Sequence, residues 1–118
     1  MGDDDVSWGF DGVRREKWGN SDSQPWGGPW QTGDVLGLAA DLSVDGSMSL
    51  SFSVNGSFSA PNGVAFYSIS APWLAPALSA QEGVFRVNFG ENPFRFSAPD
   101  SSFSSVHESS GTKANDSR

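Results

Sequence analysis

Four acidic residues, three of them beside glycine, are the first places in this sequence where catalysis could occur. Asp11 with Asp34, or Asp41 with Asp45, could supply the two carboxylates that glycoside hydrolysis needs. Short acids beside glycine are also typical of turns, because the carboxylate accepts a hydrogen bond from a nearby backbone amide. We interpret these acids as turn residues and keep a small glycosidase as the third hypothesis for function.

The single histidine and one calcium-like motif are the other candidates for chemistry. His107 and a serine of its segment could form a hydrolase pair, but such a pair needs a preorganised site and we expect this tail to be disordered. Residues 41–46 (DLSVDG) open like a calcium-binding loop, yet Phe52 stands where that loop requires a glutamate. With no cysteine and one histidine, an ordinary zinc site has almost no ligands. We expect no catalytic residue, no metal ion and no cofactor.

The charge of the chain argues against nucleic acid and membranes as partners. Fourteen acidic and seven basic residues among 118 give a formal net charge of −7, whereas a nucleic-acid-binding protein needs a basic surface. No apolar run approaches the roughly 18 residues of a membrane-spanning helix, and the start Met1-Gly2-Asp3-Asp4-Asp5 is unlike a signal peptide. The sequence therefore predicts a soluble, cytoplasmic protein.

The residue pattern predicts an all-β domain with short strands and many turns. Apolar residues alternate most clearly over residues 36–42 and 48–54, with hairpin-turn signals at Asp45-Gly46 and Asn55-Gly56. Shorter strands are expected over residues 6–10, 63–67, 74–78, 85–89 and 94–96. The expected core aromatics are Trp8, Trp30, Phe52 and Phe89. No helix is expected beyond a short turn near residues 70–74.

Two stretches differ from the predicted strands. Residues 19–31 are rich in turn-forming residues and contain Trp26 and Trp30, which predicts an ordered loop with aromatic anchors. Residues 100–118 are polar and rich in serine, so we expect a disordered tail, and residues 1–5 form an acidic start that we also expect to be disordered.

Six short motifs occur in the order and spacing of a SPRY domain. They are Ser7-Trp8-Gly9-Phe10-Asp11-Gly12, Trp30-x-x-Gly33-Asp34-Val35-x-Gly37, Asp41-Leu42 with Leu50-Ser51-Phe52-Ser53-Val54-Asn55-Gly56, Gly63-Val64-Ala65-Phe66, Pro76-Ala77-Leu78-Ser79, and Val87-Asn88-Phe89-Gly90 with Pro93-Phe94. The chain resembles the SPRY domains of ryanodine receptors and of large RING-finger ubiquitin ligases, and we assign residues 6–99 to this domain. The resemblance implies a bent, jelly-roll-type β-sandwich of two antiparallel sheets. It also implies a protein-interaction role with no catalysis, cofactor or small-molecule substrate.

One departure from the family pattern concerns the first motif. SPRY domains usually carry several strands before it, and here it begins at Ser7. We therefore expect a partial SPRY domain that lacks its N-terminal strands. Open sheet edges and an uncovered apolar face would favour association.

The resemblance implies that partner peptides dock on loops at one end of the sandwich. One such loop follows the Pro-x-Leu-Ser motif and consists of Ser79, Ala80, Gln81 and Glu82. Some peptide-binding relatives place a tryptophan in this loop, so the glutamine argues against the same peptide specificity. We expect the loop to bind a partner peptide, because loops on a rigid sandwich are where recognition varies most freely.

Trp26 and Trp73 are secondary candidates for partner contact. Each stands beside proline in a predicted loop, where it is either a contact anchor or a tryptophan that covers one end of the sandwich. The predicted function is a protein-interaction module that binds a partner peptide or loop, and the resemblance extends this to substrate recruitment for a ubiquitin ligase. An exposed tryptophan that stacks on a sugar ring would instead favour a carbohydrate-binding β-sandwich.

Overall fold

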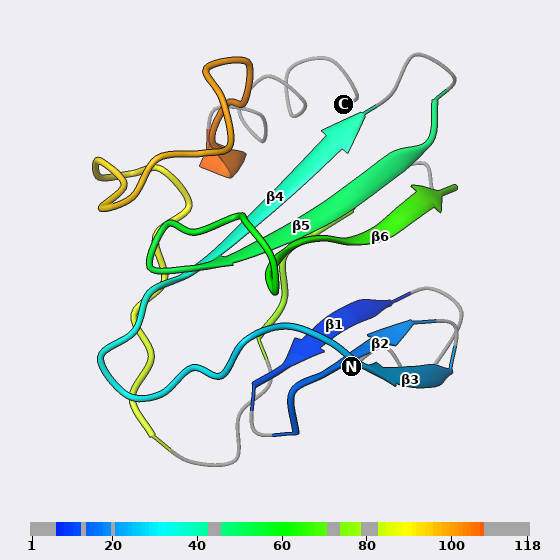
Figure 1. Ribbon diagram of the computed structural model, residues 1–118. Helices are drawn as coiled ribbons and strands as arrows, with labels where there is room; N and C mark the ends of the chain where they lie inside the picture. Colours follow the sequence, from blue (N-terminus) through cyan, green and yellow to red (C-terminus); the bar gives the residue numbers. More distant parts are fainter. Residues whose placement is uncertain are drawn as a thin grey trace. The chain divides into compact units, whose positions relative to one another are not determined.

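Short antiparallel strands make up most of the regular structure among the described residues (Figure 1). The computed structural model describes residues 7–12, 14–19, 21–42, 46–70, 74–78 and 83–107. The strands among these residues are β1 (Trp8–Asp11), β2 (Glu16–Gly19), β3 (Asp22–Pro25), β4 (Leu36–Leu42), β5 (Met48–Val54) and β6 (Gly63–Ile69). They form two antiparallel three-stranded sheets in the orders β1-β2-β3 and β4-β5-β6. The predicted all-β sandwich of two antiparallel sheets is confirmed.

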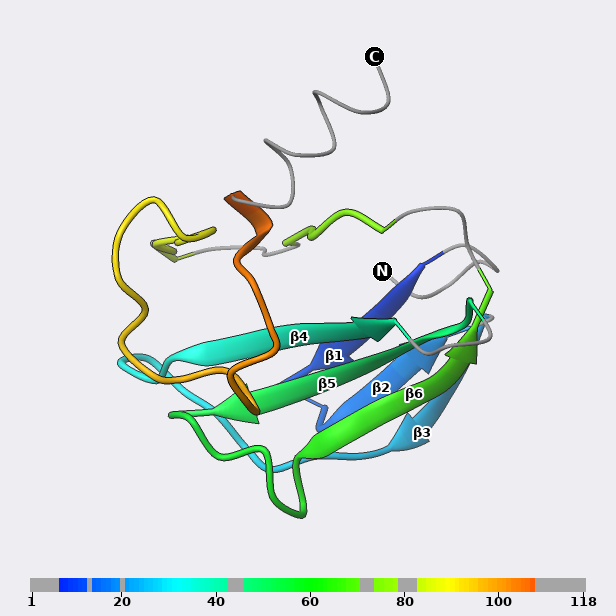
Figure 2. The same ribbon diagram turned by 90° about the horizontal axis from the view of Figure 1, so that it is seen from above.

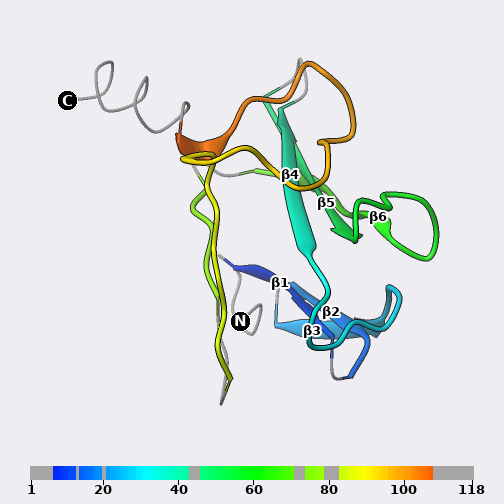
Figure 3. The ribbon, with the colours of Figure 1, turned by 90° about the vertical axis from the view of Figure 1, so that its left-hand side faces the viewer.

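The chain divides into two compact units, Met1–Ser79 and Ala80–Arg118. All six strands of the described part lie in the first unit, where the two sheets form two layers (Figure 3). The predicted acidic start at residues 1–5, the possible turn at 70–74 in its central part, and the tail from residue 108 onward lie outside the described residues.

The strongest alternation in the sequence forms the centre of the second sheet. β4 and β5 pair over their whole length, from Leu36 opposite Val54 to Leu42 opposite Met48, and both ranges are those predicted. Asn55 follows with φ of 52° and Gly56 with φ of 84°, which are the left-handed values of a type I′ turn. The predicted Asn-Gly turn is therefore confirmed, although further residues separate it from β6.

The first sheet contains two strands that the sequence did not predict. β3 lies within the turn-rich loop expected over residues 19–31, so that prediction is wrong for Asp22–Pro25, and β2 lies just before this stretch, where no strand was predicted. β2 pairs with β1 and β3 pairs with β2, so that Phe10 stands opposite Lys17 and Lys17 opposite Gln24. Because cross-strand partners share a face, this face changes from aromatic at β1 to polar at β3. A polar face gives no hydrophobic alternation for sequence reasoning to detect.

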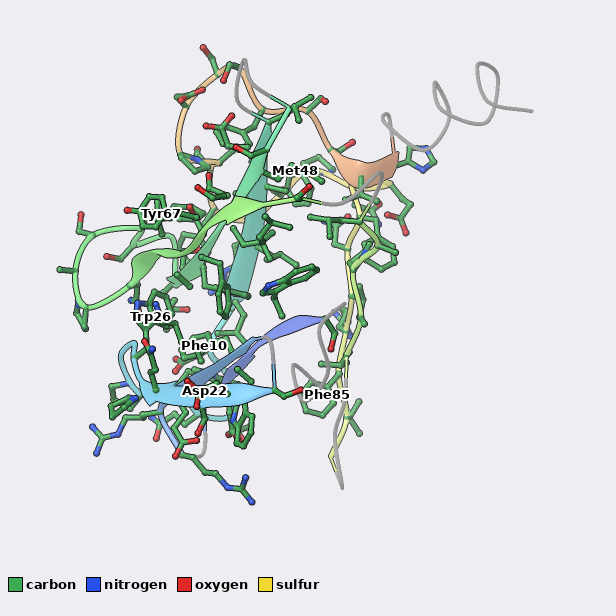
Figure 4. The ribbon with its side chains drawn as sticks, turned by 90° about the vertical axis from the view of Figure 1, so that its right-hand side faces the viewer. Phe10, Asp22, Trp26, Met48, Tyr67 and Phe85 are labelled. Carbon is green, nitrogen blue, oxygen red and sulfur yellow. The ribbon has the colours of Figure 1, made fainter. Side chains whose placement is uncertain are left out.

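Aromatic side chains fill the space between the sheets. Phe10 has its ring centroid 5.1 Å from that of Trp26, 5.5 Å from that of Phe52 and 6.3 Å from that of Trp30, and most of the pairs in this group meet edge to face, as aromatic rings prefer. We call these four residues the aromatic cluster. Figure 4 shows two of its members, Phe10 and Trp26, between the sheets. Trp30 and Phe52, two of the expected core aromatics, pack in this cluster but are only half-buried.

Glycine is required beside the aromatic cluster at Gly12. A β-carbon at this position would overlap the indole ring of Trp30, at its Cε2, Nε1 and Cζ2 atoms. The indole Nε1 is buried and has no hydrogen-bond partner among the described residues. The backbone of Gly12 thus covers one edge of the indole at van der Waals distance.

Three predicted strands do not form among the described residues. Residues 74–78, 85–89 and 94–96 carry no strand, and Phe89, an expected core residue, is 39% exposed. In the second unit, Asn88 organises the backbone instead, since its Oδ1 accepts hydrogen bonds from the amides of Gly90 (2.9 Å) and Asn92 (3.4 Å). Alternation signals a capacity to pair, but the strand forms only where a partner strand is in place.

Candidate functional site

Most of the predicted partner-binding residues cannot be placed. Ser79, Ala80, Gln81 and Glu82 lie outside the described residues, as does Trp73. Trp26 is described, and it is half-buried with its ring against Phe10 and, at 5.9 Å between centroids, Phe52 (Figure 4). Of the two roles considered for Trp26, its geometry corresponds to a tryptophan packed against the sandwich, and it gives the carbohydrate-binding hypothesis no support.

The segment that carries Trp26 and Trp30 is pinned to the connection between β5 and β6. We call residues 26–35 the tryptophan loop. The amide of Gly28 donates to Asn62 Oδ1 at 3.0 Å, and the amide of Val35 donates to Asn55 Oδ1 at 2.9 Å. Two asparagine side chains thus hold the two ends of the loop. Sequence reasoning recognised Asn55 only as a turn residue, and both asparagines share the signal of a following glycine.

Asp34 belongs to the same network. Its Oδ1 accepts a hydrogen bond from Asn55 Nδ2 at 3.1 Å, and its Oδ2 accepts one from the amide of Gln31 at 2.9 Å. The bond from Asn55, and then the bond from Gln31, lower the pKa of Asp34 below its ordinary value because both stabilise the ionised carboxylate. The predicted turn role of Asp34 is confirmed.

The acids considered for glycoside hydrolysis have local roles. Asp11 Oδ1 accepts a hydrogen bond from the amide of Arg14 at 3.1 Å, which is again a turn interaction within the same segment. Asp41 lies exposed on β4 and Asp45 lies outside the described residues. The backbone amide of His107 donates to the carbonyl of Phe89 at 2.7 Å within the second unit. These arrangements give no support to a carboxylate pair or to a hydrolase pair.

A hollow in the surface of the first unit lies between β6 and the sheet β1-β2-β3. It has a volume of about 300 Å³ and is lined by Trp8, Lys17, Gly19, Asp22, Gln24, Ala65, Phe66 and Tyr67. We call it the β3–β6 groove. Lys17 Nζ donates to the carbonyl of Ala65 at 2.6 Å and lies 5.4 Å from the centroid of the Phe66 ring. A β-carbon at Gly19 would come within 2.8 Å of both Phe66 and Trp8, so glycine is needed where the two sheets approach.

The sequence profile that describes the SPRY domain matches residues 1–92. The chain belongs to the SPRY family. It is 34% identical over 103 residues to "E3 ubiquitin-protein ligase RKP" of Arabidopsis thaliana, which covers 81% of this chain and 7% of that protein. It is 32% identical over 111 residues to "Heterogeneous nuclear ribonucleoprotein U-like protein 2" of Homo sapiens, which covers 91% of this chain and 14% of that protein. No solved structure matches the chain.

Family membership gives the general function. SPRY domains are protein-interaction modules and not catalytic domains, so this SPRY chain is a protein-interaction module. The chain spans only a small part of either curated relative. In the part of the chain that the structure describes, no helix has the length and apolar character to cross a membrane.

Proposed function

We propose that this SPRY chain binds a peptide or an exposed loop of a partner protein. The observation that carries the proposal is the family match over residues 1–92. The proposed contact residues are Ser79, Ala80, Gln81 and Glu82, with Trp73 beside them in sequence. Trp26 contributes indirectly, because its ring packs against Phe10 and fixes the start of the tryptophan loop.

Recruitment of a substrate for ubiquitin transfer is the role we infer for the longer protein to which such a domain belongs. The support is the 34% identity with a protein named as an E3 ubiquitin-protein ligase. In that role the SPRY chain supplies recognition and a different domain supplies the transfer chemistry. The net charge of −7 favours a protein partner over nucleic acid.

Quantitative capture of partner proteins tests the proposal. The immobilised 118-residue chain is compared with the double variant Gln81→Ala/Glu82→Ala and with Asp41→Ala, an exposed residue whose substitution removes the same charge. We expect the double variant to lose a defined set of captured proteins that Asp41→Ala retains. Identical capture by all three chains, with near-ultraviolet circular dichroism showing that each is folded, would refute the proposed loop.

A further inference from the structure

β4 is an open and regular edge of the second sheet. Figure 2 shows β4 at one edge of this sheet and β6 at the other. The register of β6 with β5 shifts twice, and the carbonyl of Ala65 accepts a hydrogen bond from Lys17 Nζ at 2.6 Å. Bulges and inward-pointing lysines are devices that block the addition of a strand to a sheet edge. β4 pairs with β5 over seven consecutive residues without a shift and contains no lysine, so it has neither device.

The inner face of β4 is apolar and uncovered. The first sheet lies beneath the other two strands, since Phe52 of β5 packs on Phe10 of β1 and Phe66 of β6 lies against Gly19 of β2. Every second residue of β4 lies on the same face as Phe52. The large side chains of this row are 40%, 51% and 67% exposed, at Leu36, Leu38 and Leu42. A strand added beside β4 would therefore meet an apolar row.

The same residues direct their backbone groups to the open edge. The amide of Asn55 donates to the carbonyl of Val35 at 2.8 Å, so this pair, which continues the β4–β5 register, is a hydrogen-bonded one. Hydrogen-bonded and non-hydrogen-bonded pairs alternate in an antiparallel ladder. Asp41 therefore bonds to β5, whereas the amides and carbonyls of Ala40 and Leu42 point away from it. These groups have no paired strand among the described residues.

Residues 85–88 (FRVN) have the pattern of a strand and belong to no strand of the described structure. Phe85 and Val87 are 47% and 51% exposed, and Arg86 between them is exposed as well. Pairing would end before Phe89, because its amide and its carbonyl already take part in hydrogen bonds within the second unit. The segment is therefore a short donor strand with an apolar face and a charged face.

We propose that residues 85–88 of one copy of this chain add, antiparallel, to the open edge of β4 in a second copy. The register that places Arg86 opposite Asp41 joins opposite charges on the outer face. The same register sets the two apolar side chains of the segment opposite Ala40 and Leu42, on the inner face. A shift by one residue would turn these side chains to the other face, and a shift by two would separate the charges.

A two-fold axis lets each copy give its segment to the other, so that both open edges are filled. The dimer then contains two pairs of Arg86 with Asp41. The net charge of −7 on each copy opposes association, but at physiological salt the repulsion between charges more than about 8 Å apart is largely screened. Directly opposite residues lie within that distance. This dimer goes beyond the proposed function, because it requires no partner protein.

Disulfide cross-linking tests which chain supplies the strand. The chain has no cysteine, and residues 41 and 86 would form a non-hydrogen-bonded pair with Cα atoms about 4.5 Å apart, a distance that a disulfide spans. We expect Asp41→Cys/Arg86→Cys to form covalent dimers on oxidation in air. An equal mixture of Asp41→Cys and Arg86→Cys should give mostly dimers with one chain of each kind, identified by mass spectrometry. A mixture of Asp41→Cys with Arg95→Cys, an exposed position elsewhere in the second unit, should show no such preference.

Sedimentation equilibrium at physiological salt tests the charge pair. Arg86→Glu should weaken the dimer about tenfold, because two attractive pairs become repulsive in each dimer, and Asp41→Arg should act in the same way. The double variant Arg86→Glu/Asp41→Arg keeps the net charge and should restore dimerisation. Arg95→Glu makes the same change of charge outside the segment and should dimerise as the unchanged chain does.

Four results would overturn the proposal. The first is a monomer at every concentration up to the millimolar range. The second is a disulfide within one chain of Asp41→Cys/Arg86→Cys, which would mean that the segment pairs with its own β4. Equal weakening by Arg86→Glu and Arg95→Glu would place the interface elsewhere. Failure of the double charge reversal to restore the dimer would exclude this register.

The dimer and the proposed binding loop are tested separately. Asp41→Ala, the control of the capture experiment, should weaken the dimer and leave capture unchanged. If the chain is monomeric and Gln81→Ala/Glu82→Ala still loses its captured proteins, the dimer is wrong and the loop proposal stands. If the dimer forms as described and the loop variant captures every protein that the unchanged chain captures, the dimer stands and the loop proposal is wrong.

Discussion

Gly12 has no space for a methyl group, and replacing it with alanine tests whether the aromatic cluster is packed as described. A β-carbon there would overlap the indole of Trp30, so the ring or the backbone must move. Overpacking of this kind costs about 1–3 kcal/mol. Replacing a glycine also reduces the conformational entropy of the unfolded chain, which stabilises the folded state by about 0.4–1 kcal/mol. We therefore expect Gly12→Ala to lower the free energy of unfolding by about 1–2 kcal/mol.

Urea and thermal unfolding, followed by tryptophan fluorescence, measure this loss. At about 4–8 °C per kcal/mol for a small domain, the expected fall in melting temperature is about 4–16 °C. Gly28→Ala is the matched control, because its β-carbon would meet nothing closer than Pro61 at 3.4 Å. Its free energy of unfolding should equal that of the unchanged chain or exceed it by up to about 1 kcal/mol, because only the effect on the unfolded chain remains.

The indole of Trp30 provides a rescue experiment. Phenylalanine lacks the pyrrole nitrogen and most of the ring edge that Gly12 touches, so Trp30→Phe should offset part of the loss in Gly12→Ala. A double-mutant cycle gives the coupling between the two sites. The reasoning is refuted if Gly12→Ala is as stable as the unchanged chain, or if Gly28→Ala is equally destabilised.

Three further predictions concern the hydrogen bonds of Asn55, the packing of the second sheet and the net charge of the chain. Asn55→Gly keeps the left-handed turn but removes the bonds to Val35 and Asp34, so stability at neutral pH should fall by about 1–2 kcal/mol in urea unfolding. The folded chain lowers the pKa of Asp34, so the stabilisation from its ionised carboxylate is present above the pKa of the unfolded chain and is lost as the pH falls through the pKa of the folded chain. The free energy of unfolding should therefore decline from pH 5 to pH 2, and it should decline less steeply in Asn55→Gly, which lacks the hydrogen bond to Asp34. A steeper decline in that variant would contradict this. Gly37→Ala places a β-carbon against the buried Ser53 hydroxyl; it should cost about 1–3 kcal/mol, and Ser53→Ala should recover part of the loss, whereas no recovery would exclude that contact as the cause. The net charge of −7 predicts no gel retardation of single-stranded RNA at physiological salt, and a retarded band would contradict it.

The sequence was informative where one physical signal dominated. β4 and β5 were predicted with their exact bounds, because apolar residues recur at every second position in both, serines alternate with them in β5, and a glycine turn follows β5. β2 and β3 were missed, because their inner face carries Lys17, Gln24 and Asp22, and its pairing depends on backbone hydrogen bonds that side-chain pattern does not report. The β-sandwich fold was predicted from the family motifs taken together, because no single motif was specific enough.

The β3–β6 groove and the hydrogen bonds from Gly28 to Asn62 and from Val35 to Asn55 could not be predicted from sequence. Each joins residues far apart in the chain, as where Lys17 meets Ala65 and Gly28 meets Asn62. A single sequence shows which side chains can donate or accept, but not which partners the fold brings together. The strand prediction at residues 85–89 was wrong for a different reason. Apolar residues alternate there, but in the described structure no strand pairs with this segment.

The two asparagines that hold the tryptophan loop also determine how the domain ages chemically. Asn55 and Asn62 each precede a glycine, the sequence in which asparagine most readily loses ammonia to become aspartate. Conversion at Asn55 would keep an oxygen to accept from the amide of Val35, but it would replace the amide that donates to Asp34 with a second carboxylate. Repulsion between the two adjacent carboxylates would then separate residue 55 from Asp34. In stored protein each such conversion would add one mass unit, and conversion at Asn55 would loosen this end of the tryptophan loop.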